Sequence, residues 1–260
     1  ASNTADIFSF VTPTEFVDLP SEGRYYPEGD PLHGAQTLEI RHMTAKEEDI
    51  LTSEALLKKG LAIDRLVESV IVDKRVKIRD LLVGDKNAII IAARITGFGP
   101  LYDSSVTCPE CSAAAETTFD LSKLPIIRAD ELPDTVSYEN DEFCFTLPTT
   151  GVSLGVKLLT VADEHTLTQI NEKKKKRRLP SARSTTLLKL IITSVGGHTD
   201  KESIDKFIEM MPLPDVQYLR TVYEKIKPDI DVECDFFCEE CEYVGKVVMP
   251  LTAAFFWPRR

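Results

Sequence analysis

Hydrophobic and polar positions follow no regular period at the start of the chain. Residues 1–34 contain four prolines and three glycines, which predicts an extended or loosely turned N-terminal arm. The arm also carries several large apolar side chains (Phe8, Phe10, Phe16, Val17, Leu19, Tyr25 and Tyr26). Because such side chains are unfavourable in water, we expect the arm to lie across another surface, either of this protein or of a partner.

A helical pattern follows over residues 35–100. After a short alternating stretch at Leu38, Ile40 and His42, Thr44 and Glu47 form a capping box that opens a helix. This helix is predicted to end at Lys58-Lys59-Gly60, and a second one to run from Leu61 to Ile71.

A third helix is predicted through the apolar run from Ala88 to Ile95. Asp85 is expected to cap it. Arg94 is a charge in an apolar setting, and we expect it to form an ion pair with a nearby carboxylate such as Asp85. Residues 35–100 are therefore interpreted as a compact helical block.

In the second half of the chain, hydrophobic positions follow the period of a strand in some stretches and the period of a helix in others. Alternation predicts strands on both sides of residues 108–111 and 238–241, around Phe143 to Leu147, and from Val156 to Val161. Helices are predicted after Asp163, over Ser184 to Val195, after a capping box at Thr199 and Glu202, and after Pro214. The fold class is therefore α+β, mainly helical, with short antiparallel strands.

Two CxxC turns lie 130 residues apart, Cys108-Pro109-Glu110-Cys111 and Cys238-Glu239-Glu240-Cys241. The same offset superposes Phe119 on Met249 and Leu121 on Leu251, so each turn is followed by a short strand. Thiolates at i and i+3 of a tight turn can reach one tetrahedral ion, so Cys108, Cys111, Cys238 and Cys241 are predicted to hold a structural Zn²⁺.

Other interpretations of the two turns stay open. Metal-free knuckles and a redox dithiol are alternatives, although neither pair opens a helix that would lower a thiol pKa. Such knuckles often carry glycine after the second cysteine, whereas this chain has Ser112 and Glu242. Cys234 could replace Cys238 as a ligand, but the repeat favours Cys238.

The zinc ribbon is discontinuous in sequence. We divide the chain into the arm (1–34), the helical block (35–100), the ribbon (101–122 with 230–252), an inserted strand–helix region (123–229) and an aromatic tail (253–260). The tail contains Phe255, Phe256 and Trp257, which we expect either to enter the core or to dock on a partner.

Composition and charge argue against several classes of function. The net charge of −11 argues against a broad basic surface for nucleic acid. No apolar run has the length of a membrane span, and the first residues lack the pattern of a signal peptide. Six cysteines without an export signal predict a reducing compartment, a cytoplasm.

Six consecutive cations, Lys173 to Arg178, form the one strongly basic stretch. A solvated loop, an acidic protein partner and nucleic acid all fit this run. The sequence contains no GxGxxG, P-loop, HExxH or GxSxG motif, so an enzyme is not favoured. The alternative to a structural role is a zinc-ribbon regulator of nucleic acid that contacts phosphates through this run.

Three stretches together resemble a known family. They are Leu19-Pro20-Ser21 with Met43 to Leu51, Leu82 to Asn87 leading through Ala92 to Ile95 to the first knuckle, and Pro250-Leu251 with Phe255 to Pro258. In this order, over nearly the whole chain, they resemble the baseplate hub and hub-assembly proteins of T-even-like contractile-tailed bacteriophages.

The resemblance implies a non-enzymatic protein that builds or forms the central part of a phage baseplate. It implies other baseplate and tail proteins as partners, and a location in the virion tail and, during assembly, in the host cytoplasm. It also implies that the knuckle cysteines are structural ligands, and it carries over no catalytic residue.

Overall fold

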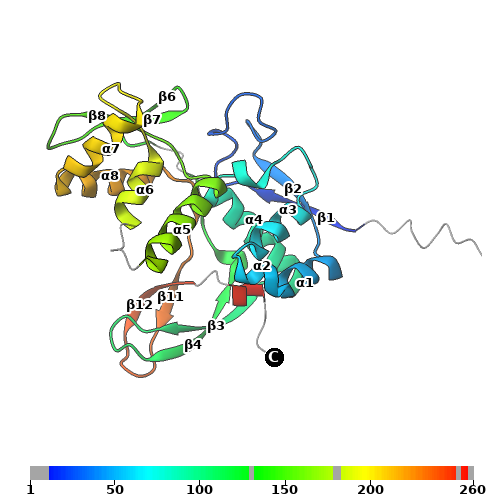
Figure 1. The fold of residues 1–260 in the computed structure, drawn as a ribbon. Helices are drawn as coiled ribbons and strands as arrows, with labels where there is room; N and C mark the ends of the chain where they lie inside the picture. Colours follow the sequence, from blue (N-terminus) through cyan, green and yellow to red (C-terminus); the bar gives the residue numbers. More distant parts are fainter. Residues whose placement is uncertain (1–11, 129–131, 178–182, 250–252, 257–260) are drawn as a thin grey trace, which may run out of the picture.

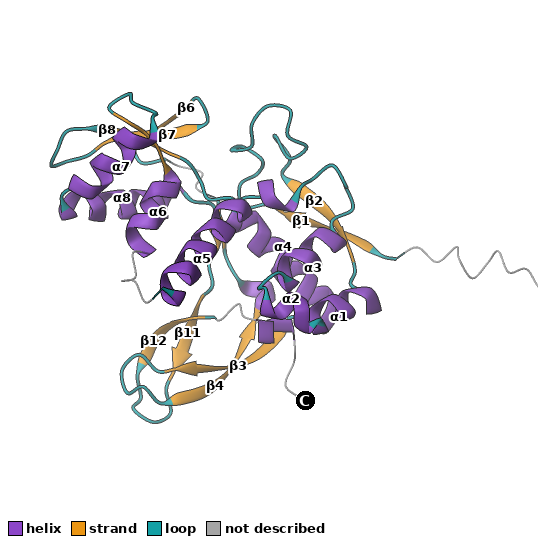
Figure 2. Cartoon of the chain, viewed as in Figure 1, coloured by secondary structure: helices purple, strands orange, loops and turns teal. Residues whose placement is uncertain are grey.

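The computed structural model describes residues 12–128, 132–177, 183–249 and 253–256. Three groups of elements surround the central helices α4 (Val83–Phe98) and α5 (Val161–Lys176) (Figure 1). An N-terminal hairpin with short helices lies on one side and a small sheet with three helices on the other. Two further hairpins project from the same end of the molecule (Figure 2).

The N-terminal segment folds back on its own protein. Strand β1 (Thr14–Asp18) pairs antiparallel with β2 (Thr37–Arg41). The turns between them bury Leu19, Tyr26 and Leu32. The part of the arm that the structure describes is thus a strand and a series of turns that join the core. Most of the described apolar side chains of the arm pack within the chain itself, although Phe16 on β1 is 68% exposed.

Short helices cover the next segment, with bounds close to those that the caps predict: α1 (Ala45–Thr52), α2 (Glu54–Lys58), α3 (Ala62–Val70), the 3₁₀ turn η1 (Ile78–Asp80) and α4. The capping box at Thr44 and Glu47 is confirmed. The first predicted helix is interrupted at Ser53, whose backbone is extended.

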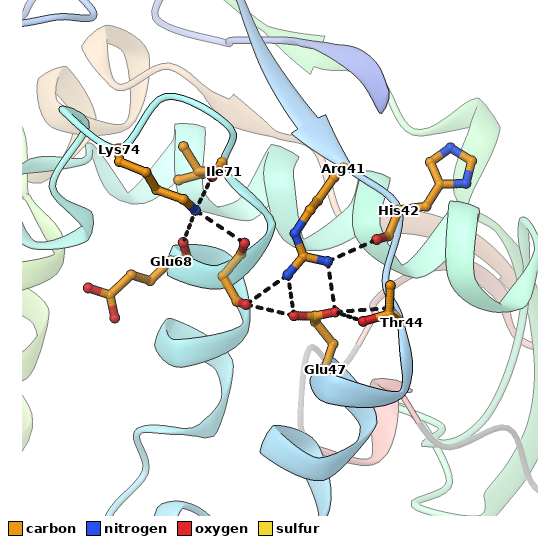
Figure 3. A network of polar contacts seen from close by, with 8 residues as sticks. Arg41, His42, Thr44, Glu47, Glu68, Ile71 and Lys74 are labelled. Carbon is orange, nitrogen blue, oxygen red and sulfur yellow. Dashed lines mark hydrogen bonds and ion pairs between the residues drawn. The ribbon is translucent and has the colours of Figure 1, made fainter. Parts of the chain in front are cut away.

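The Glu47 carboxylate does more than cap α1. It also accepts hydrogen bonds from Arg41 and Ser69, and so joins α1 to β2 and α3 (Figure 3).

Helix α4 begins differently from the prediction. Its N-cap is Leu82, and Asp85 lies fully buried in the first turn. The Asp85 carboxylate accepts hydrogen bonds from the Ser21 N–H at 3.0 Å, the Ser21 hydroxyl at 2.6 Å and the Tyr26 hydroxyl at 2.7 Å. The expected ion pair between Asp85 and Arg94 does not form. Asp85 lies at the opposite end of helix α4 from Arg94, and its carboxylate oxygens accept hydrogen bonds from the N-terminal turns instead.

The inserted region builds a four-stranded antiparallel sheet in the order β6-β7-β8-β9, with helices packed beside it. Its strands are β6 (Ser137–Glu139), β7 (Glu142–Thr146), β8 (Ser153–Val156) and β9 (Ile192–Val195), and its helices are α6 (Arg183–Ile191), α7 (Lys201–Met210) and α8 (Leu213–Ile226). A separate short pair joins β5 (Ile126–Ile127) to β10 (Asp229–Ile230).

Several boundaries in this region differ from the prediction. The helix expected to reach Val195 ends at Ile191, because the β-branched residues that follow pair with β8 as strand β9. The strand expected from Val156 to Val161 ends at its first residue. Helix α5 is capped by Thr160 with Asp163 as the box partner, and α7 by Asp200.

Pro214 lies in the first turn of α8, as predicted. The description "mainly helical" is wrong, since 41% of the residues that the structure describes are helical and 25% lie in strands. The α+β class with short antiparallel strands is confirmed. Among the described helices, none is long and apolar enough to cross a bilayer.

Candidate metal centre

Two hairpins with the same local structure carry the CxxC turns. The first joins β3 (Leu101–Thr107) to β4 (Ala114–Asp120), and the second joins β11 (Glu233–Phe237) to β12 (Val244–Val248). In each, the first cysteine donates its N–H to the carbonyl five residues on, at 2.8 Å for Cys108 and 2.9 Å for Cys238. The carbonyl of that cysteine accepts from the residue after the second cysteine, Ser112 or Glu242. The repeat predicted from the 130-residue offset is therefore present in the backbone.

The tips of the hairpins bring the four predicted ligands together. Their sulfur atoms all lie within 4.8 Å of one another. Two cross pairs, Cys108 with Cys241 and Cys111 with Cys238, are each 3.7 Å apart. Four sulfurs bound to one tetrahedral zinc at about 2.3 Å would lie about 3.8 Å apart, so the thiols fit such an ion. The same separation is far longer than a disulfide bond of about 2.05 Å.

The electrostatics of the cluster also favour a cation. Burial would raise the pKa of Cys108, but the N–H groups of Cys111 and Glu110 outweigh it and lower that pKa to about 7. The Tyr243 N–H favours the Cys241 thiolate, yet burial and the other three thiols raise the pKa of Cys241 to about 12. Four adjacent thiols cannot all ionise alone, whereas a divalent ion would stabilise the four thiolates.

The residue after each knuckle adopts a backbone conformation that favours glycine. Ser112 has φ of 60° and Glu242 has φ of 59°. This left-handed geometry explains why glycine is common at the position, and it shows that the turn forms with other residues at some cost.

The remaining cysteines lie outside the cluster. Cys234 is half-buried on β11, where its thiol contacts the Val232 carbonyl at 3.8 Å. The structure therefore brings Cys238, and not Cys234, to the first knuckle. Cys144 lies half-buried on β7, facing away from Phe143 and Phe145. Each knuckle is flanked by strands, so no helix N-terminus is present to activate a redox thiol.

The aromatic C-terminus is buried as far as the structure describes it. Phe255 and Phe256, in the 3₁₀ turn η3 (Ala253–Phe256), are 1% and 0% exposed. The Phe255 ring stacks edge-on against Tyr102 at 4.9 Å, and its carbonyl accepts from Arg94 Nε at 2.8 Å. Of the two alternatives expected for the tail, core burial is the one observed for these two rings. Trp257 lies outside the described residues.

The partner predicted for Arg94 is also wrong. Its guanidinium is buried and donates to the carbonyls of Phe255, Gly99 at 2.9 Å and Leu101 at 3.2 Å, with the Phe98 ring beside it. Desolvation by this burial lowers the pKa of Arg94. The side chain fastens η3 and the start of the first hairpin to the end of α4.

The basic run is helical where it is described. Lys173 to Lys176 form the last turn of α5, where cations interact favourably with the helix dipole, and Arg177 is its C-cap. Arg178 lies outside the described residues. The described part of the run, residues 173–177, is thus the end of a helix and not a loop.

One charged cluster had no signal in the sequence. His165 on α5 contacts the Asp64 carboxylate of α3, and Lys86 on α4 contacts both Glu164 and Asp64. The members come from segments up to 101 residues apart, so no spacing rule could have grouped them. The cluster joins three helices through a hydrogen bond of His165 and the ion pairs of Lys86.

Two matching CxxC hairpins thus bring four thiols together within an α+β fold. The family of T4 bacteriophage base plate proteins matches residues 13–257, and the chain belongs to that family. It is thus a structural component of a phage tail, with other tail proteins as its partners. No curated protein and no solved structure matches the chain.

Proposed function

We propose that the protein is a non-enzymatic component of the baseplate hub, either built into it or needed to assemble it, and that Zn²⁺ at Cys108, Cys111, Cys238 and Cys241 holds its fold. The arrangement of the four sulfur atoms supports the zinc site. Family membership supports the tail role. The protein would work in the host cytoplasm during assembly and in the virion tail afterwards.

In this proposal the metal has no catalytic task. Four thiolates fill a tetrahedral shell and leave no position for substrate. The ion would fix residues 101–122 beside 230–252 as one discontinuous ribbon, with residues 123–229 inserted in it. Because the two halves are so distant in sequence, a single ion would restrict a long loop of the unfolded chain.

Incorporation into tails tests this role. Purified protein is added to tail assemblies from a phage mutant that lacks it, and its presence in sedimenting baseplates is measured together with bound metal. We expect wild-type protein to enter the particles and to carry zinc. Protein that stays in the soluble fraction while tails form would contradict the hub role, and absence of zinc from incorporated protein would contradict the metal site alone.

The same preparation tests the alternative of a nucleic-acid-binding regulator. Glu239 and Glu240 are neighbours in the second knuckle, and both acidic side chains are exposed at the tip of the ribbon. A phosphate-binding surface needs the opposite charge. We expect filter binding to DNA and RNA to be weak at all salt concentrations, and a steep loss of tight binding with added salt would favour the regulator instead.

A further inference from the structure

The outward faces of the two hairpins differ although their backbones match. The second hairpin exposes three large apolar side chains, Phe237 (57%), Val244 (77%) and Val248 (62%). At the equivalent positions, 130 residues earlier, the first hairpin has the small or polar residues Thr107, Ala114 and Thr118, also exposed. Both hairpins serve the thiol cluster equally, so the metal site does not account for the apolar face of the second one.

The backbone of the same region has unpaired edges, which follow from the hydrogen-bond register. In β3–β4, Cys108 N–H bonds the Ala113 carbonyl and Leu121 N–H bonds the Pro100 carbonyl. Antiparallel ladders alternate, so the N–H and C=O groups of Ser105 and Thr107 point away from β4.

The second hairpin has the equivalent register. Cys238 N–H bonds the Tyr243 carbonyl, and Met249 N–H bonds the Val232 carbonyl. The backbone groups of Val244, Lys246 and Val248 therefore point away from β11. Within the described ranges, β3 pairs with β4 alone and β12 with β11 alone.

These two edges face a common groove of about 420 Å³. It is lined by residues of β3 and the first knuckle on one side and of β12 on the other: Ser105, Val106, Thr107, Pro109, Lys246, Val247 and Val248. Lys246 is the one charged residue in this lining. It makes no ion pair with any residue that the structure describes, although the chain has a net charge of −11.

We propose that an extended segment of another tail protein lies in this groove as an added strand between β3 and β12. Its main chain would bond the outward N–H and C=O groups of Ser105, Thr107, Lys246 and Val248. Alternate apolar side chains would cover Val244 and Val248, and a carboxylate would meet Lys246. This inference rests on the proposed assembly role and names the surface that serves it.

The groove favours a free segment over a second copy of this chain. A strand inserted between two others needs both of its edges free. Every strand that the structure describes already uses at least one edge within its own sheet. A second copy could therefore bond one side of the groove and would leave the other open.

The test uses incorporation of the full chain into tails that lack it, with matched proline variants. Lys246→Pro removes an outward N–H and no bond of the hairpin, and Asp235→Pro does the same at its cross-strand partner, on the edge of β11 away from the groove. Losing the main-chain bond and the charge contact should reduce incorporation of Lys246→Pro by roughly tenfold, with Asp235→Pro near wild type. Equal incorporation of both variants would overturn the proposal.

Two charge-reversal variants provide the test if the proline variants do not fold. Lys246→Glu should reduce incorporation, and Glu233→Lys, on the other edge of the same hairpin, should not, with unchanged thermal stability and metal content for both. If wild-type protein itself fails to enter tails, the proposed function fails. If wild type and Lys246→Glu enter equally, the groove proposal fails and the proposed function stands.

Amide hydrogen exchange identifies what fills the groove. Amides of Ser105, Thr107, Lys246 and Val248 should exchange at least roughly tenfold more slowly in assembled tails than in free protein. Unchanged exchange would overturn strand addition. Slow exchange already present in the free protein, together with dimers in sedimentation, would assign the groove to a second copy and would also overturn the proposal.

Discussion

At residues 112 and 242 the chain adopts a left-handed backbone without glycine. An L-residue in this conformation costs about 1–2 kcal/mol relative to its preferred regions. Both knuckles have this conformation at the same position of the turn: φ is 60° at Ser112 and 59° at Glu242. The departure from the usual glycine is therefore a local strain and leaves the cysteine geometry intact.

Replacing Ser112 by glycine should relieve that strain. Glycine enters the left-handed region freely but loses more entropy on folding, so we expect Ser112→Gly to raise the free energy of unfolding by about 0.5–1 kcal/mol. Urea unfolding of the metal-loaded protein measures the change. Ser104→Gly, in the middle of β3, is the matched control and should lower stability. A loss of stability in Ser112→Gly would show that the serine makes a contact that offsets its strain.

Some residue contacts could be predicted from the sequence and others could not. The cysteines were predictable because two i, i+3 pairs with a repeated downstream pattern carry their own geometry. Arg94 was not, because its acceptors are backbone carbonyls, one of them 161 residues away, and carbonyls leave no mark in a sequence. Asp85 was assigned to a helix cap, yet its three donors come from Ser21 and Tyr26 in the N-terminal turns.

At the scale of elements, one buried carboxylate joins a strand and two helices. Glu47 accepts from Arg41 on β2 and Ser69 on α3 and closes the cap of α1 (Figure 3). Burial alone would raise the pKa of Glu47, but the hydrogen bonds from Arg41, Ser69 and Thr44 outweigh it and lower the pKa to about 2. The sequence predicted the cap from its local spacing, and it gave no sign of the long-range partners.

The lowered pKa sets a pH window for stability. Since the ordinary value is 4.5, ionised Glu47 stabilises the fold above pH 4.5, and this contribution is lost as pH falls toward 2. We expect Glu47→Gln to lower the free energy of unfolding at neutral pH by about 2–4 kcal/mol and to flatten its dependence on pH across that window. Denaturant titrations at several pH values measure both effects.

The neighbouring exposed residue provides the control for this prediction. Glu48→Gln, one position along the same helix, should change neither quantity beyond a few tenths of a kcal/mol. A Glu47→Gln protein with the same acid dependence as wild type would show that other carboxylates govern the window.

Elements with local signals were predicted well, and those decided by tertiary pairing were not. Pro214 and the capping box at Thr44 fix helix starts through short-range geometry. Ile192 to Val195 continue an apolar pattern that suits a helix or a strand, and only pairing with β8 selects the strand. The N-terminal turns looked irregular because their order comes from Asp85 and from the core.

For the whole molecule, the central question is what holds the two hairpins side by side. They come from opposite ends of a long insertion, and the four thiols meet between their tips. Without a cation these thiols resist joint ionisation, as the pKa of about 12 for Cys241 indicates. Metal binding should therefore be coupled to the folding of the ribbon more than to that of the distant four-stranded sheet.

Replacing a ligand tests this coupling. Cys111→Ser should lower metal content and the melting temperature together, the latter by roughly 5–10 °C, because metal-binding energy becomes folding energy when the unfolded chain has no site. Hydrogen exchange should accelerate in β3, β4, β11 and β12 and remain slow in β7 and β8. Cys144→Ser, which changes a cysteine outside the cluster, should retain both metal and melting temperature. If Cys111→Ser loses the metal while its stability and exchange pattern stay unchanged, packing of the two hairpins is sufficient by itself, and the ion has no structural role.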